Sequence, residues 1–191
     1  AAKIYTVDDA DITGYLVAPK AEVLAQLVEK TSPAAVLLPS GGEGKEIAGR
    51  LAVKTGSGLI TDAVDVAADG TTTQSVFAGN YTVQAKVTKG TPIITVKPNA
   101  AAPEESAGAG AVEKVSVTVS DSAKKAQIVA SQPREATGRP ELTEAAIVVS
   151  GGRGTGGNFE PVENFADSLG AAVGASRAAV DSGWKPHAFQ I

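Results

Sequence analysis

Two arginines stand where the chain passes from an apolar run into a turn, and each could bind an anion. The first, Arg153, lies in the glycine turn Gly152-Arg-Gly-Thr-Gly-Gly157, which follows the apolar run Ala145–Val149. A strand, a glycine turn and a helix N-terminus, in that order, hold phosphate groups in many open α/β sheets. We therefore expect Gly152, Arg153 and Gly154 to lie against an anionic cofactor. The alternative is a tight turn that serves packing alone.

The second arginine, Arg177, follows Ser176 at the end of the small-residue run Ala171–Ala175. That run has the pattern of a short buried strand, and its small side chains would let a planar ring approach the backbone. Because ligands of open α/β sheets bind at the carboxyl ends of the strands, we expect both arginines to face one crevice. The alternative is a surface arginine that pairs with Asp181, four residues further along a helix.

A helix is expected between these two places. Asn158 is a typical capping residue for its start, and Gly170 can end it in the left-handed conformation. The apolar residues between them fall on one helical face. They are Phe159, Val162, Phe165, Ala166 and Leu169.

Other motifs that could carry chemistry have simpler interpretations. The segment Ser40–Lys45 has the wrong spacing for a phosphate loop, and Glu46 stands where such a loop needs Ser or Thr, so we interpret it as a turn and a helix start. Ser176 lacks the G-x-S-x-G surroundings of a nucleophile, and His187 is expected to be an exposed loop residue. Glu104 and its neighbour are interpreted as solvated. The sequence thus predicts no catalytic residue.

Composition narrows the class of protein. The 191 residues are 43% hydrophobic, enough for one core or two modest domains. A net charge of −4 argues against nucleic acid as a partner. No run of 18 apolar residues predicts a membrane span, and the chain has no cysteine and one histidine, so no metal site is expected.

Before the glycine turn, hydrophobic periodicity predicts alternating helices and strands. Amphipathic helices are expected at 19–30 and 43–54, and continuous apolar strands at 34–38 and 58–62, after a short strand at 3–7. This alternation predicts a parallel α/β sheet with right-handed connections.

From about residue 63 the pattern becomes antiparallel. A hairpin is expected at 75–87 around an Ala78-Gly-Asn80 turn, with one face of its second strand buried. A strand is expected at 92–98, and a further antiparallel strand at 114–120.

The polar stretch 121–142, broken by Pro133 and Pro140, predicts a connector. We therefore expect an N-terminal α/β domain at 1–140 and the start of a second, Rossmann-like α/β domain at 141–191.

The second region closely resembles the alpha subunit of electron transfer flavoprotein. The residues that carry the resemblance are Val148–Gly154, then Asn158 and Phe159 opening a helix, and then the long stretch Leu169–Trp184. The first region is similar to the N-terminal domain of that subunit at Ala34–Pro39, Gly49–Ala52, Gly58–Asp62 and Val96–Pro98.

The resemblance implies an electron carrier and not an enzyme in its own right. It implies a heterodimer that holds FAD, with AMP in the beta subunit. FAD would take electrons from acyl-CoA dehydrogenases of fatty acid beta-oxidation and pass them to a membrane quinone oxidoreductase. The protein would act in a bacterial cytoplasm or a mitochondrial matrix.

The resemblance also implies roles for single residues. Arg153 is expected near the phosphate and ribose of FAD, and Ser176 is expected to hydrogen-bond the cofactor. Arg177 should lie against the isoalloxazine ring, where a fixed cation favours the negatively charged reduced flavin. Ile191 would begin the next backbone contact.

Relative to the family, the chain lacks a first strand and helix and most of the flavin domain. We therefore expect a fragment whose residues 141–191 pack loosely or lean on another chain, with FAD held only by the complete protein. The alternative function is an NAD(P)- or FAD-binding α/β enzyme whose catalytic residues lie beyond Ile191.

Overall fold

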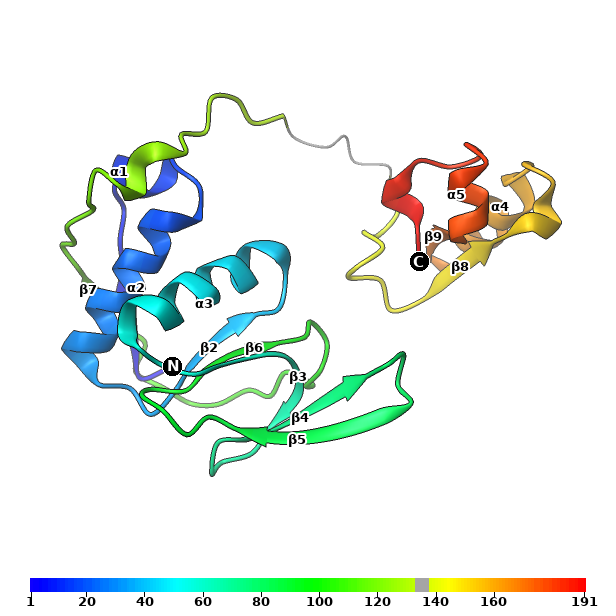
Figure 1. Ribbon diagram of the computed structural model, residues 1–191. Helices are drawn as coiled ribbons and strands as arrows, with labels where there is room; N and C mark the ends of the chain where they lie inside the picture. The colour runs from blue at the N-terminus through cyan, green and yellow to red at the C-terminus, as the bar shows by residue number, and fades with distance from the viewer. Residues whose placement is uncertain (133–137) are drawn as a thin grey trace. The chain divides into compact units, whose positions relative to one another are not determined.

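The computed structural model describes residues 1–132 and 138–191, and it divides into two compact units, Ala1–Ser131 and Gln132–Ile191 (Figure 1). The domain boundary predicted near Pro140 falls inside the second unit. Pro133, the other proline of the predicted connector, lies outside the described residues.

A five-stranded sheet forms the frame of the first unit. In spatial order its strands are β2 (Val36–Pro39), β6 (Ile93–Val96), β3 (Leu59–Val66), β4 (Thr71–Val76) and β5 (Tyr81–Lys86). The prediction of a parallel sheet is confirmed, because β2, β6 and β3 run parallel. The strand at 92–98 was expected in the antiparallel part, yet as β6 it lies between the two predicted parallel strands. The predicted antiparallel addition is also confirmed, as the hairpin of β4 and β5.

Two amphipathic helices, α2 (Val17–Thr31) and α3 (Gly42–Thr55), cover one face of the parallel strands (Figure 1). Leu51 of α3 and Ile93 of β6 are fully buried where these layers meet. Gly56 ends α3 in the left-handed conformation, with φ of 63°. Both predicted helices are therefore present, and burial of their apolar stripes explains why they form.

The outer strand β5 is more exposed than its alternating pattern predicts. Tyr81 is 64% exposed and Val83 41%, so the face expected to be buried is largely open. The physical reason is that α3 packs on β2, β6 and β3, whereas β5 lies at the far end of the sheet, beyond the strands that this helix covers. Alternation alone shows that a strand has two different faces, and it does not show that either face is covered.

The strand predicted at 114–120 is wrong in place and direction. The actual strand, β7 (Ala111–Lys114), lies earlier and pairs in parallel with β1 (Lys3–Thr6). The residues after it form no strand and are held by side chains of α2. Gln26 donates to the carbonyl of Thr118 at 2.7 Å and accepts from its N–H at 3.1 Å. The side-chain amide of Gln26 thus makes the hydrogen bonds that a neighbouring strand would make. Alternation in the sequence is the same in both cases, so it cannot distinguish a strand from a segment held by a side chain.

Two short segments complete the first unit. They are α1 (Ala10–Thr13) and the 3-10 turn η1 (Ala123–Lys125).

The second unit has a two-stranded parallel sheet with helices after each strand. Its elements are β8 (Val148–Gly151), η2 (Arg153–Thr155), α4 (Glu160–Leu169), β9 (Ala172–Ala175), α5 (Arg177–Asp181) and η3 (His187–Phe189). Phe159 and Ala166 pack with β9 in a buried cluster. This cluster contradicts the expectation of loose packing on the side that α4 covers.

Several apolar side chains elsewhere in this unit are more exposed to solvent than predicted. Ile147 and Val148 were expected in a buried strand, yet they are 49% and 40% exposed. On the predicted buried face of α4, Phe165 is 59% and Leu169 45% exposed. A sheet of two strands is too narrow to cover the whole apolar stripe of a helix.

The ends of α4 agree with prediction in part. Gly170 ends the helix with φ of 60°, as expected. The N-cap position is taken by Phe159, so the prediction of Asn158 as the cap is wrong by one residue. Asn158 still helps to begin the helix, because its side-chain oxygen accepts from the N–H of Glu160 at 3.1 Å.

The carboxylate of Glu113 in β7 should make the first unit sensitive to acid. Hydrogen bonds from Lys3 and then Lys30, at 2.8 and 2.6 Å, hold the pKa of Glu113 at about 2, below its ordinary 4.5. A lowered pKa gives stability that is present above the ordinary value and is lost as the pH falls towards the folded value. The destabilisation caused by Glu113→Gln should therefore be visible in urea unfolding at neutral pH and should vanish near pH 2.

Glu104→Gln is the control, since Glu104 is exposed and makes no ion pair with residues 1–132 or 138–191. Equal effects of the two variants at neutral pH would contradict the role assigned to Glu113.

Candidate functional site

The carboxyl ends of β8 and β9 lie side by side. Gly151 is the register partner of Ala175, and the N–H of Ser176 donates to the carbonyl of Gly151 at 2.9 Å. The glycine turn and the Ser176-Arg177 pair therefore leave the sheet at the same edge. The structure brings the two predicted places together, as the argument from parallel strands requires.

The glycine turn is tight and passes close to Ser176. Within it the N–H of Thr155 donates to the carbonyl of Gly152 at 3.1 Å. A Cβ added at Gly152 would lie 3.4 Å from the Ser176 hydroxyl oxygen, whereas one at Gly154 would meet no atom within 4 Å. The turn thus presents bare backbone to its surroundings next to a hydroxyl group.

Glycine is required at the end of this turn. Gly156 and Gly157 have φ of 59° and 93°, which disfavour residues with a side chain. A Cβ at Gly157 would also lie 3.3 Å from the indole nitrogen of Trp184. The last two glycines of the pattern are therefore required by the backbone conformation. For these two residues this agrees with the alternative interpretation, a tight turn that serves packing.

Arg153 is the exposed side chain of this turn. It makes no ion pair with any residue in the described parts of the chain. Its carbonyl accepts from the N–H of Gly156 at 3.1 Å, which holds its backbone in the turn. The guanidinium is therefore available to an anion from solution.

Ser176 and Arg177 open α5 on the other side of the edge. The hydroxyl of Ser176 accepts from the N–H of Ala179 at 3.3 Å, so this residue is both the helix cap and a half-buried polar group. Arg177 is 80% exposed, and its Nε lies 3.4 Å from Asp181. The surface ion pair considered as an alternative is thus present. An exposed pair of this kind contributes only about 0–1 kcal/mol, so Arg177 can exchange Asp181 for a ligand.

Ile191 reaches the same edge. Its N–H donates to the carbonyl of Ala175 at 3.1 Å, and Gln190 forms a parallel bridge with Ala175. A Cβ at Gly174 would lie 2.7 Å from Ile191 and 2.5 Å from Ser150. Because Gly174 has no side chain, three chain segments can meet around β9.

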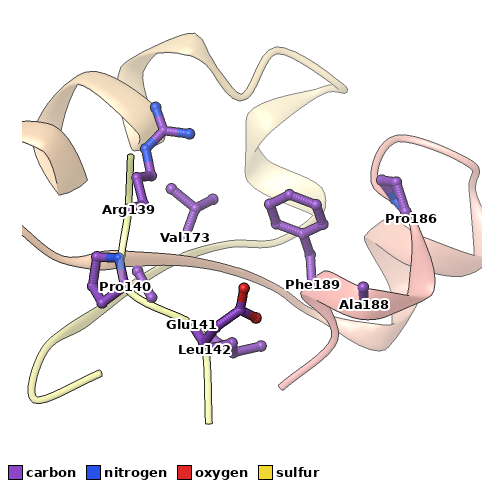
Figure 2. Close-up of a pocket in the computed structure, with 9 residues that line it drawn as sticks. Arg139, Pro140, Glu141, Leu142, Val173, Pro186, Ala188 and Phe189 are labelled. Carbon is purple, nitrogen blue, oxygen red and sulfur yellow. The ribbon is translucent and has the colours of Figure 1, made fainter. Parts of the chain in front are cut away.

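A cavity of about 270 Å³ lies in the same unit (Figure 2). The residues that line it are Arg139, Pro140, Glu141, Leu142, Ala172, Val173, Pro186, Ala188 and Phe189. Arg139 makes two hydrogen bonds to Asp167 of α4, at 2.5 and 2.9 Å, which raise the pKa of Arg139 and lower that of Asp167. Sequence reasoning missed this cavity and this pair, because no local pattern links residues so far apart in the chain.

The simpler interpretation of Ser40–Lys45 is confirmed. Ser40 directly follows β2, and α3 begins at Gly42. Asp62 accepts a hydrogen bond from Ser40 at 2.8 Å, and Lys45 lies 2.8 Å from the same carboxylate oxygen. Lys45 first, and then Ser40, lower the pKa of Asp62. The positive charge of Lys45 is thus paired with a carboxylate of the protein itself.

Among residues 1–132 and 138–191, no group of His, Cys, Asp or Glu side chains could hold a metal ion, and His187 is exposed. In the same residues, none of the helices has the length and apolar character to cross a membrane.

Comparison with known families agrees with this geometry. Residues 1–120 match the model of the electron transfer flavoprotein domain, and residues 141–191 match that of the electron transfer flavoprotein FAD-binding domain. The chain belongs to the electron transfer flavoprotein family. The candidate edge lies wholly within the FAD-binding match of this family.

Individual relatives are named as alpha subunits. The whole chain is 52% identical to the electron transfer flavoprotein subunit alpha of Mycobacterium leprae and 53% identical to that of Mycobacterium tuberculosis, covering 60% of each. Over 82% of its length it is 35% identical to a probable mitochondrial alpha subunit of Caenorhabditis elegans, covering 47% of that protein. The chain thus spans about 60% of the length of these two curated Mycobacterium relatives.

The residues at the edge suit the cofactor of this family. Arg153 and Arg177 offer cations for phosphate or for a negatively charged ring, and Ser176 offers a hydroxyl. The bare backbone at Gly154 and Gly156, where a Cβ would meet nothing within 4 Å, leaves room for a ligand to approach. FAD has a pyrophosphate, several sugar hydroxyl groups and a planar isoalloxazine ring, and groups of these kinds can bind each of them.

Two glycines of this region should respond very differently to an added methyl group. In Gly151→Ala the new Cβ would lie 2.7 Å from the buried Phe159 ring and 2.9 Å from Thr155. Overpacking of this kind costs about 1–3 kcal/mol. The matched control is Gly154→Ala, which should change stability by less than about 0.5 kcal/mol. Urea unfolding of the two variants measures both values, and equal losses would refute the packing of Phe159 under Gly151.

Proposed function

We propose that the protein acts as the alpha subunit of an electron transfer flavoprotein, in a heterodimer that holds FAD in this subunit and AMP in the beta subunit. The observation that carries the proposal is the shared edge, where the N–H of Ser176 meets the carbonyl of Gly151 at 2.9 Å. That contact puts the glycine turn of Arg153 beside the segment that begins with Arg177. The FAD-binding match over residues 141–191 supports the same cofactor.

The side chains at the edge suit electron transfer. Transfer of an electron through a bound flavin needs no general base, and the groups offered here are cations, one hydroxyl and backbone amides. FAD supplies the redox chemistry when bound. The role of this chain is to hold the ring and to set its potential.

Arg177 is the residue that we expect to set that potential. A positive charge near the ring stabilises whichever form of the flavin carries more negative charge, which is a reduced form. Two unit charges 4 Å apart interact by about 4 kcal/mol at an effective dielectric constant of about 20. The Asp181 carboxylate, 3.4 Å from Arg177, opposes this effect until the arginine turns to the cofactor.

The proposed partners follow from the family. Acyl-CoA dehydrogenases of fatty acid beta-oxidation would donate electrons, and a membrane quinone oxidoreductase would accept them. Two relatives at 52% and 53% identity come from Mycobacterium, whereas a mitochondrial relative is at 35%. We therefore place the protein in a bacterial cytoplasm and not in a mitochondrial matrix.

Co-expression of the complete protein with its beta subunit tests the function. The purified heterodimer should show the visible absorption of a flavin, and an acyl-CoA dehydrogenase with its substrate should bleach it. A colourless protein that binds a nicotinamide dinucleotide would contradict the proposal and favour a dehydrogenase.

Arg177→Ala should lower the reduction potential of the bound flavin, because the reduced form loses its nearest proposed cation. The expected shift is on the order of 100 mV, which corresponds to about 2 kcal/mol for one electron. Potentiometric titration of the heterodimer measures it. The matched control is Arg50→Ala, since Arg50 forms the same kind of helical pair, with Glu46 at 2.8 Å, but in the first unit. An unchanged potential in Arg177→Ala would refute this role.

A further inference from the structure

Lys185 is a charged residue that neither the motifs nor the proposed function explains. Its side chain is only 17% exposed. Its ammonium group pairs with Glu163 of α4, whose side chain is 29% exposed. The same nitrogen lies 5.3 Å from the centre of the Phe159 ring and 5.1 Å from that of Phe189. A cation this enclosed needs such partners, because it has given up most of its water.

The partners of Lys185 support two sides of the candidate site. Phe159 lies under Gly151, the last residue of β8, where an added Cβ would come within 2.7 Å of the ring. Phe189, seen beside the cavity in Figure 2, directly precedes the Gln190-Ile191 segment that pairs with Ala175. The ammonium group of Lys185 therefore contacts both Phe159, below the glycine turn, and Phe189, just before the segment Gln190-Ile191 that returns to β9. We call Gln190-Ile191 the returning segment.

The returning segment has few other attachments. After α5 the chain runs through η3 to the edge of β9, where the parallel bridge between Gln190 and Ala175 includes the hydrogen bond from the N–H of Ile191 to the carbonyl of Ala175, at 3.1 Å. A short η3 turn contributes little rigidity of its own. Phe189 packs against the buried cluster that includes Phe159 and Ala166, and Lys185 adds its ion pair and aromatic contacts to this connection between the segment and α4.

We propose that Lys185 is a positioning residue for the flavin site: its ammonium group, held by Glu163 and two phenyl rings, keeps the backbone of residues 190 and 191 against β9 beside Ser176. The identity of the ligand as FAD rests on the proposed function. Lys185 acts through Phe159 and Phe189, and it needs no contact with the cofactor.

The test uses the complete heterodimer with Lys185→Met, which keeps the length of the side chain and removes its charge. In flavin-free protein, hydrogen exchange at the Ile191 amide should become about tenfold faster, while the amides of α4 stay unchanged. The dissociation constant of FAD, measured by flavin fluorescence on dilution of the heterodimer, should rise about tenfold. Lys185→Arg should restore both values to within about threefold, because arginine keeps the cation and stacks on aromatic rings.

Lys89→Met is the matched control, since Lys89 is exposed and has no ion pair within the described residues. It should change neither value. If Lys185→Met does not fold, Phe189→Leu removes one ring and keeps both charges, and it should give a smaller change in the same direction.

The inference and the proposed function fail in different ways. A wild-type heterodimer that does not bind flavin would refute the proposed function. Hydrogen exchange at the Ile191 amide would still measure whether Lys185 holds residues 190 and 191 against β9. A heterodimer that binds FAD equally well with Lys185→Met and Phe189→Leu, with Ile191 equally protected, would overturn the role of Lys185.

Discussion

The parallel register of β8 and β9 is the constraint on which the candidate site depends. It sets Gly151 opposite Ala175 and lets the N–H of Ser176 continue the ladder to the Gly151 carbonyl. In a parallel pair both chains leave the sheet at the same end, so two arginines far apart in sequence begin their segments side by side. A shift by one residue would move Ser176 and its neighbour away from the glycine turn.

The second unit separates groups that approach a ligand from groups that support them. Apart from Arg153 and Arg177, the edge consists mainly of glycine, serine and alanine, so that much of its surface is backbone. Beneath it, Phe159 and Trp184 fill the space that the glycines leave, and Lys185 joins Phe159 to the segment that returns to β9. Small residues above aromatic ones allow a close approach to the backbone while the rings fill the space beneath the glycines.

The two units treat the carboxyl ends of their parallel strands in opposite ways. In the first unit Asp62 lies there and pairs with Lys45 at 2.8 Å, so the positive charge is satisfied within the protein. In the second unit Arg153 has no such partner among the described residues, and Arg177 has only an exposed one. The same architecture is therefore closed to an added anion in one unit and open to it in the other.

By itself the sequence determined the helices, most strands, the convergence of two turns and the family, because periodicity and glycine spacing are local. Tertiary structure decided the rest. Alternation at 114–120 suggested a strand, but Gln26 supplied side-chain hydrogen bonds instead. Apolar Val148 and Phe165 predicted burial, but exposure depends on which layers exist to cover them. The ion pairs of Lys185 and Arg139 could be found only in the tertiary structure, because their partners are more than twenty residues away in the sequence.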